Sequence, residues 1–144
     1  MKKCFEVMTE NPTCCLPTDV ASKAGLLMKN ENVGSIPVIE SKQTRKLIGI
    51  VTDRDLAMLV VAAGRDVQTT KVADVMTQNI VTCRVDDSVQ KALDAMAKFQ
   101  LRRIPVVDDQ DRIVGIISQA DVATRVNEPE ETAEVVKEIS QPTA

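Results

Sequence analysis

The sequence predicts an α/β protein built from two similar halves. Residues 7–11 and 36–39 recur 68 positions later at 75–79 and 104–107, and residues 49–55 recur at 115–121. Within each copy, short β-branched runs alternate with helical stripes, which is typical of α/β folds. Half of a 144-residue chain buries too little surface to be stable alone, so we expect the two copies to pack on each other.

Each copy is predicted to contain a short strand, a helix, two strands and a second helix. The first helix of the first copy has apolar residues at helical spacing and either Thr18 or Asp19 as its N-cap. Gly25 stands inside this helix, where the second copy has Leu93. Because an interior glycine costs about 1 kcal/mol relative to alanine, we expect a close helix–helix approach between the copies there.

The central strands of each copy are expected at 35–39 and 47–52, and at 103–107 and 113–118. Polar connectors suited to a hairpin separate the two runs of each pair. The second helix is expected at 53–63 in the first copy and at 119–126 in the second.

The first helix of the second copy shows a clearer signal. Its start is supplied by Asp86, Asp87 and Ser88. One apolar stripe then follows at i, i+3, i+4, i+7 and i+8: Val89, Ala92, Leu93, Met96 and Ala97.

The repeat predicts a division into a first domain at 1–64, a linker at 65–74, a second domain at 75–127 and a helical tail at 128–144. The polar run 64–70 marks the linker. The tail carries a further apolar stripe after Pro129, with no counterpart in the first copy.

Composition argues against several classes of function. A formal net charge of -3 is unfavourable for sequence-independent nucleic-acid binding, and we expect no nucleic-acid partner. The longest apolar run, 56–63, is too short to span a bilayer. No apolar stretch of signal-peptide length follows the N-terminus. We therefore expect no membrane association and a cytoplasmic location.

Four cysteines show neither a disulfide framework nor paired zinc-ligand spacing: Cys4, Cys14, Cys15 and Cys83. Adjacent Cys14 and Cys15 point to opposite faces of an extended segment, and the sequence has no histidine. We expect no metal site. Unpaired cysteines suit a reducing compartment, where they act as small buried hydrophobes.

The candidate binding residues lie where the second central strand of each copy leads into the helix that follows it. Thr52-Asp53-Arg54-Asp55 and Ser118-Gln119-Ala120-Asp121 share the form hydroxyl, any, any, carboxylate. This is the outline of a helix capping box. Glu or Gln reaches back to the cap more easily than the shorter Asp, which favours an additional role. A helix start also binds phosphate, and a carboxylate one turn on can accept hydrogen bonds from two ribose hydroxyls, so capping and nucleotide binding are compatible.

Taken together, the Met-Thr, Ile-Pro-Val and Gly-Ile-Val-Thr-Asp-Arg-Asp segments resemble tandem cystathionine β-synthase (CBS) domains, a Bateman module, over about 7–62 and 75–127. The resemblance implies two domains related by an approximate twofold axis, each a three-stranded sheet with two helices, packed through their sheets. It also implies two clefts between the domains that bind AMP, ADP, ATP or a related adenosyl ligand.

The resemblance implies specific roles for residues of this chain. Asp55 and Asp121 would hold the ribose, and Thr52 and Ser118 would face the phosphates. The base would lie against the early strand and the Pro-containing strand. These residues are Thr13, Cys14, Ser35, Ile36 and Pro37 in one copy, and Val81, Thr82, Arg103, Ile104 and Pro105 in the other.

The two candidate sites differ in charge. The first has Arg54, which attracts phosphate, with Asp53 partly offsetting its field. The second lacks both charges but has Arg102 and Arg103 where the first has Gly34 and Ser35. Solvated surface is the alternative for all three arginines. We expect unequal affinities, with the first site the better candidate for occupancy.

No catalytic residues are expected, because histidine, a nucleophile elbow and a P-loop glycine run are all missing from the sequence. The sequence therefore predicts a non-enzymatic, stand-alone regulatory module without a catalytic cofactor. It would sense an adenosine nucleotide through a change in packing or dimer geometry and act on an unknown effector protein, with a homodimer implied by the resemblance.

The alternative is a ligand-free dimerisation or scaffold module whose motif residues are caps alone. A regulator of nucleic acid is a weaker third hypothesis.

Overall fold

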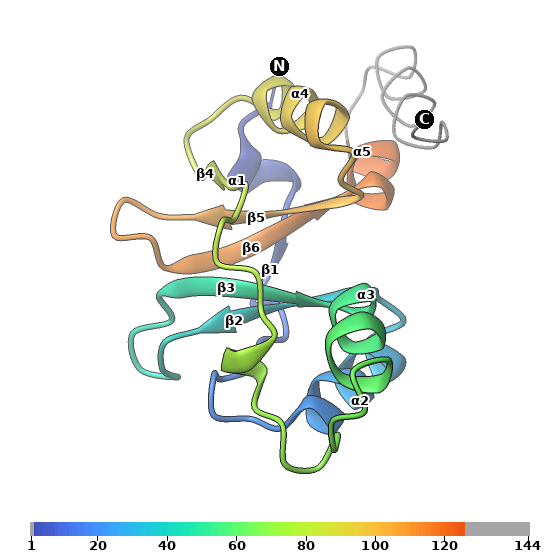
Figure 1. Cartoon of the computed structure of the whole chain (residues 1–144). Helices are drawn as coiled ribbons and strands as arrows, with labels where there is room; N and C mark the ends of the chain where they lie inside the picture. The colour runs from blue at the N-terminus through green and yellow to red at the C-terminus, as the bar shows by residue number, and fades with distance from the viewer. Residues whose placement is uncertain (1, 126–144) are drawn as a thin grey trace. The chain divides into compact units, whose positions relative to one another are not determined.

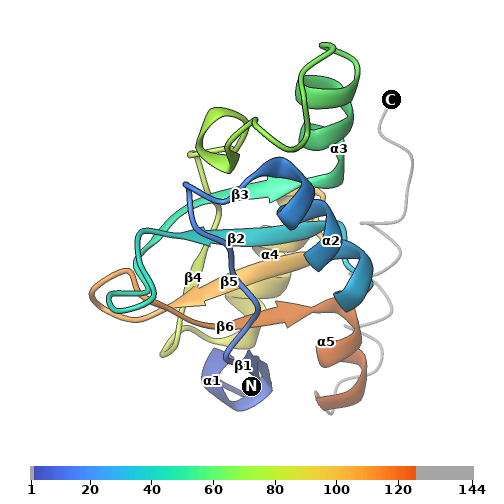
Figure 2. The same ribbon diagram turned by 90° about the horizontal axis from the view of Figure 1, so that it is seen from below.

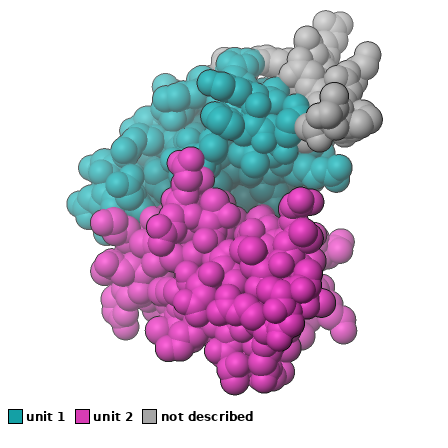
Figure 3. All heavy atoms as spheres, in the orientation of Figure 1, with its two compact units in different colours: residues 1–12, 81–144 teal, residues 13–80 magenta. Residues whose placement is uncertain are grey.

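A computed structural model describes residues 2–125 of the chain. It divides into two compact units that are described separately (Figure 3): unit 1 holds residues 1–12 and 81–144, and unit 2 holds residues 13–80. The expected helical tail at 128–144 lies outside the described residues. Among the described residues, no helix is long and apolar enough to cross a membrane.

Unit 2 is built on the hairpin β2 (Ser35–Ile39) and β3 (Leu47–Thr52), which are antiparallel. Helix α2 (Ala21–Glu31) precedes the hairpin. After it come α3 (Asp53–Leu56), the π-helical turn η1 (Ala57–Val61) and the 3-10 turn η2 (Val72–Asp74). Single-residue bridges join Cys15 to Val38 and Thr77 to Ile50. The unit therefore has two full strands, and single bridges stand where a third strand was expected.

Unit 1 contains a four-stranded sheet of order β1-β6-β5-β4 (Figure 1). Its elements in chain order are α1 (Cys4–Val7), β1 (Thr9–Glu10), β4 (Cys83–Arg84), α4 (Val89–Phe99), β5 (Arg103–Val107), β6 (Ile113–Ser118) and α5 (Gln119–Arg125). β1 is antiparallel to β6, as Figure 2 shows at the lower edge of the sheet, and β4 is parallel to β5. This sheet has one strand more than expected.

The compact units do not follow the order of the sequence repeats. The expected domains at 1–64 and 75–127 divide the chain in sequence, whereas contacts in space place residues 1–12 with 81–144 and residues 65–80 with 13–64. Thr9 of the first copy pairs with Ile116, and its repeat equivalent Thr77 pairs with Ile50. Each Met-Thr segment thus completes the sheet of the other copy.

The same exchange supplies the helix starts with hydrogen-bond acceptors. In unit 1 the N–H of Val89 donates to the carbonyl of Lys2, and in unit 2 the N–H of Ala21 donates to the carbonyl of Thr70. Lys2 and Thr70 are equivalent positions of the repeat. Helix α2 therefore begins after Val20 without a side-chain cap, and the expected cap at Thr18 or Asp19 is wrong. Backbone carbonyls satisfy the N–H groups that a cap would otherwise serve.

Two glycines let methionine side chains lie against the sheets. A Cβ at Gly115 would lie 2.4 Å from Met8 Sδ, and a Cβ at Gly49 would lie 2.7 Å from Met76 Sδ. Both pairs lie within one unit and are equivalent in the repeat. At Gly25 a Cβ would meet the Leu56 side chain at 3.6 Å, an ordinary contact. The close approach expected at Gly25 is therefore not found within unit 2.

Each unit has its own core. In unit 1 it lies between α4, the sheet and α1, with Val7, Leu93 and Ile117 fully buried. In unit 2 it is formed by Ala24, Val38 and their neighbours. Aliphatic side chains and cysteines make up both cores, because the two phenylalanines, which are the chain's only aromatic residues, are about half exposed.

Candidate functional site

In unit 2 the hairpin and α3 bring three predicted site residues together. Ser35 and Thr52 are direct partners in the β2–β3 ladder. Thr52 then becomes the N-cap of α3, with its Oγ1 accepting from the N–H of Asp55 at 3.0 Å. Asp55 Oδ2 accepts from the N–H of Thr52 at 2.9 Å in return. The strand register and the helix start thus place two hydroxyls and a carboxylate at one end of the hairpin.

These reciprocal bonds form a complete capping box. Although Asp is shorter than Glu or Gln, its carboxylate reaches the N-cap N–H at ordinary hydrogen-bond length, so the length of Asp gives no reason for a role beyond capping. The bond uses one carboxylate oxygen. In the described part of the chain, the second oxygen of Asp55, Oδ1, accepts no hydrogen bond.

The equivalent end of unit 1 repeats this geometry. Arg103 pairs with Ser118 in the β5–β6 ladder. The N–H of Asp121 donates to Ser118 Oγ at 3.1 Å, and Asp121 Oδ2 accepts from the N–H of Ser118 at 3.0 Å and from its Oγ at 3.1 Å. The capping motif is therefore present in both units.

The two carboxylates differ in their second oxygen. Thr9 Oγ1 donates to Asp121 Oδ1 at 3.0 Å, so both oxygens of Asp121 are engaged, and this residue is only 9% exposed. Thr77 is the repeat equivalent of Thr9, and no hydrogen bond joins Thr77 to Asp55 among the described residues. Sequence reasoning missed Thr9 as a site residue, although its recurrence in the Met-Thr block was a usable signal.

The two charged residues at the start of α3 lie toward solvent. Asp53 and Arg54 are exposed, and the N–H of Asp53 donates to the carbonyl of Gly34 at 2.9 Å. A Cβ at Gly34 would lie 3.1 Å from Asp53 Oδ2. In unit 1 the corresponding bond runs from Gln119 N–H to the carbonyl of Arg102. Glycine at 34 thus leaves room for the Asp53 carboxylate beside the strand.

The remaining predicted residues lie along the strands. Ile36, Pro37, Ile104 and Pro105 are buried. Thr13 and Cys14 precede Cys15, whose N–H donates to the Pro37 carbonyl. Thr13 is held by Glu31, and Cys14 Sγ accepts from Arg45 in the β2–β3 loop, at the opposite end of the hairpin from Thr52.

In unit 1 the residues Val81 and Thr82 lead into β4 and so stand beside β5, which contains Ile104 and Pro105. Val81 packs against the unit 1 core, whereas Thr82 is exposed. They occupy the early-strand position that the sequence repeat predicts. Cys83, which follows them, pairs with Val106 of β5 as its repeat equivalent Cys15 pairs with Val38 of β2 in unit 2.

The helix that follows the first motif changes conformation partway. α3 has four residues and continues as the π-helical turn η1, where the N–H of Ala62 donates to the carbonyl of Ala57. The continuous helix expected at 53–63 is therefore replaced by two conformations.

This fold and its duplicated motif define a tandem CBS-domain protein. The CBS domain model matches residues 4–62 and 72–128, and the chain belongs to the CBS domain family. It is 36% identical over 140 residues to the CBS domain-containing protein YhcV of Bacillus subtilis, covering 97% of this chain and 96% of that protein. That relative therefore consists almost entirely of the region shared with this chain.

Two solved structures share the fold. The crystal structure of Hypoxic Response Protein I with two coordinated zinc ions superposes with a TM-score of 0.77 at 29% identity, covering 87% of this chain and 99% of that one. The structure of CBSX2 in complex with AMP gives 0.72 at 22% identity, covering 98% and 100%. Within residues 2–125 of this chain, no three His, Cys, Asp or Glu side chains form a group suited to a metal ion.

Proposed function

We propose that the chain is a regulatory module that binds an adenosine nucleotide at the Thr/Ser-x-x-Asp end of its units, with unit 2 as the higher-affinity site. The observation that supports this is the Asp55 carboxylate. One oxygen is fixed by the Thr52 N–H, and Oδ1 accepts no hydrogen bond among the described residues. An ionised carboxylate is an acceptor for the paired hydroxyls of a ribose. The AMP bound by CBSX2 supports this ligand class.

The neighbouring groups suit the rest of a nucleotide. Ser35 and Thr52 place two hydroxyls beside the carboxylate, and both can donate to phosphate oxygens. Arg54 is exposed at the same helix start and adds a positive charge. In unit 1 the arginines stand instead at the entrance of β5. The phosphate end of the ligand would therefore be held by different charges in the two units.

Unit 1 is proposed to bind more weakly because a ligand there must displace the hydrogen bond from Thr9. That bond joins a hydroxyl to a carboxylate, and charge-assisted bonds of this kind contribute about 1.5–3 kcal/mol. Losing it without full compensation would weaken binding by roughly 10-fold to 100-fold. Thr9 thus acts as an internal competitor for the ribose hydroxyls.

Calorimetry of the full chain against AMP, ADP, ATP and S-adenosylmethionine tests the proposal. Asp55→Asn keeps an oxygen that can accept from the Thr52 N–H but removes the charge, so it should weaken the tighter site about 10-fold or more with little loss of stability. Asp109→Asn, at an exposed loop position, is the matched control. Thr9→Val should strengthen the weaker site by releasing Asp121.

A ligand-free scaffold remains the competing function, and the complete capping boxes favour it, because they satisfy the motif without a ligand. It predicts that no adenosine compound binds below millimolar concentration. It also predicts that Asp55→Ala costs about 1 kcal/mol through the lost cap, while Asp55→Asn changes nothing measurable. These two results together would refute nucleotide sensing.

We further propose that the module acts as a homodimer through the helical face of unit 2. Leu26 on α2 and Met58 and Val61 on η1 are 55%, 53% and 68% exposed. Large apolar side chains exposed together are typical of interaction surfaces. Sedimentation of the wild type and of Val61→Glu should give a dimer and a monomer respectively, and an unchanged mass for Val61→Glu would contradict this surface.

A further inference from the structure

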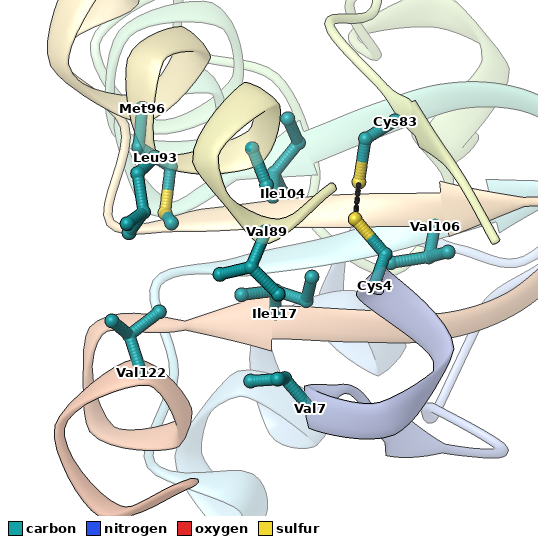
Figure 4. Close-up of a cluster of buried hydrophobic side chains, with 11 residues drawn as sticks. Cys4, Val7, Cys83, Val89, Leu93, Met96, Ile104, Val106, Ile117 and Val122 are labelled. Carbon is teal, nitrogen blue, oxygen red and sulfur yellow. Dashed lines mark hydrogen bonds between the residues drawn. The ribbon is translucent and has the colours of Figure 1, made fainter. Parts of the chain in front are cut away.

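Two cysteines far apart in sequence meet inside unit 1. Cys4 begins α1 and Cys83 begins β4, and their sulfur atoms lie 3.6 Å apart (Figure 4). Both side chains are buried, at 0% and 3% exposure. Figure 4 shows the two sulfurs pointing at each other between Val89 and Val106. The pair is therefore enclosed by the unit 1 core on the described part of the chain.

The backbones on both sides of the pair are anchored. The N–H of Cys4 donates to the carbonyl of Asp87 at 2.9 Å, and the N–H of Phe5 donates to Val85. Cys83 is held in the parallel ladder opposite Val106. A disulfide bond requires the sulfurs to approach by about 1.5 Å, from 3.6 Å to about 2.05 Å. Small rotations of two side chains from fixed backbones supply such a movement.

We propose that Cys4 and Cys83 form a reversible redox pair, which closes to an intramolecular disulfide when the protein meets a peroxide. The bond would fasten α1, and with it the segment that carries Met8 and Thr9, to the rest of unit 1. This proposal stands on the contact between the two sulfurs and is independent of nucleotide binding. It changes the expectation that the cysteines act simply as buried hydrophobes.

The two thiols differ in acidity, which makes Cys4 the first to react. The hydrogen bond shared with Cys83 lowers the pKa of Cys4, against the effect of burial and of Asp87, whereas the same hydrogen bond and burial raise the pKa of Cys83. The Cys4 thiolate would attack the peroxide oxygen and become a sulfenic acid, releasing water. The Cys83 sulfur then attacks Cys4 Sγ, forming the S–S bond and releasing a second water. Two thiols are oxidised and one hydrogen peroxide is reduced.

Unit 2 offers an internal control in Cys14 and Cys15. Burial raises the pKa of Cys15 to about 12. Burial also raises the pKa of Cys14, although the charge and the hydrogen bond of Arg45 act in the opposite direction. Cys15 belongs to the other unit from Cys4 and Cys83, and among the described residues its sulfur makes no contact with another cysteine sulfur like that between Cys4 and Cys83. We therefore expect both to stay reduced under conditions that oxidise Cys4.

The test uses the full folded chain, treated with hydrogen peroxide at equimolar to tenfold excess, quenched, and then unfolded for thiol counting and peptide mapping. Cleavage after glutamate at Glu6 and Glu10 separates Cys4 from Cys14 and Cys15, so the pairing can be assigned by mass. We expect two of the four thiols to be lost, a Cys4–Cys83 peptide pair, and full recovery of the thiols with a reductant. The Cys14→Ser/Cys15→Ser variant should behave identically.

Cys83→Ser should stop at an oxidised Cys4 that a sulfenic-acid reagent traps. The wild type also provides a measurement that does not depend on this variant's folding: its melting temperature should rise after oxidation, because the bond joins residues distant in sequence. Four free thiols after treatment, or a disulfide that involves Cys14, Cys15 or a second chain, would overturn the proposal.

Discussion

The methionine–glycine contacts allow a quantitative test of the packing in each unit. Replacing Gly115 by alanine would place a Cβ 2.4 Å from Sδ, 2.8 Å from Cγ and 3.0 Å from Cβ of Met8. The terminal part of Met8 is flexible, but its own Cβ moves only with the backbone of the segment that leads into β1. Overpacking by one methyl group costs about 1–3 kcal/mol, and we expect Gly115→Ala to fall near 3 kcal/mol.

The equivalent change in unit 2 should cost less. A Cβ at Gly49 would lie 2.7 Å from Met76 Sδ and 3.2 Å from the Thr77 carbonyl, so we expect about 2 kcal/mol for Gly49→Ala. Unfolding in urea followed by far-ultraviolet circular dichroism measures both, since the sequence has no Trp or Tyr for fluorescence. With a slope of about 2 kcal/mol per M, Gly115→Ala lowers the midpoint by roughly 1.5 M.

A double-mutant cycle with Met8→Ala distinguishes a clash from a general loss of stability. Met8→Ala removes Sδ and Cγ, the two atoms nearest to the new Cβ, and keeps only the Met8 Cβ at 3.0 Å, so the two changes should be non-additive by at least about 1 kcal/mol. The reasoning is refuted if Gly115→Ala unfolds at the wild-type midpoint. It is equally refuted if the two free-energy changes add within about 0.5 kcal/mol.

Three further outcomes are expected. Gly25→Ala should stabilise the protein by up to about 1 kcal/mol, seen as a higher urea midpoint, because the added methyl makes an ordinary contact in a helix interior. Gln100→Gly should stabilise it by about 0.5–1 kcal/mol in the same assay, because Gln100 ends α4 at a φ of 56°. Burial raises the pKa of Asp108, but hydrogen bonds from Arg112 and Gln110 lower it more, so its net pKa lies below the usual value. The resulting stabilisation is present above the pKa of an unfolded Asp, about 3.9, and is lost as pH falls through the lower pKa of the folded state. Asp108→Asn should therefore be less stable than wild type at pH 7 and equally stable near pH 2; a difference that persists in acid would contradict this account.

The central strands were predicted to the residue. The runs 35–39, 47–52, 103–107 and 113–118 are β2, β3, β5 and β6. These strands could be predicted because the evidence lies in neighbouring residues: each strand is a run rich in β-branched residues, bounded by polar turn residues. The helix expected at 53–63 was wrong in its conformation after Leu56, since nothing in the run 57–61 distinguishes a π-helical turn from an α-helix by periodicity alone.

The exchange of Met-Thr segments was not predictable from the repeat. Met8-Thr9 and Met76-Thr77 have the same sequence, and the strands that receive them, 47–52 and 113–118, are similar, each with a Gly-Ile pair and a terminal hydroxyl residue. A Met-Thr segment could pair with the glycine-containing strand of its own copy or with that of the other copy, and the local contacts would be the same. The connecting segments determine which of the two pairings forms. For the same reason sequence reasoning missed both the Thr9–Asp121 bond and the Cys4–Cys83 contact, which join residues far apart in the sequence.

The segment exchange also has a consequence for the order in which the protein is made. Unit 2 is one continuous segment, residues 13–80, so all of its residues have left the ribosome before β6 emerges. Residues 2–12 emerge first, yet β1 must wait for β6 at 113–118. During that interval Val7 and Cys4, which are fully buried in the finished unit, face solvent or a chaperone. We therefore expect unit 1 to fold last and more slowly, because its sheet pairs residues 9–10 with residues 115–116, which lie far apart in the sequence.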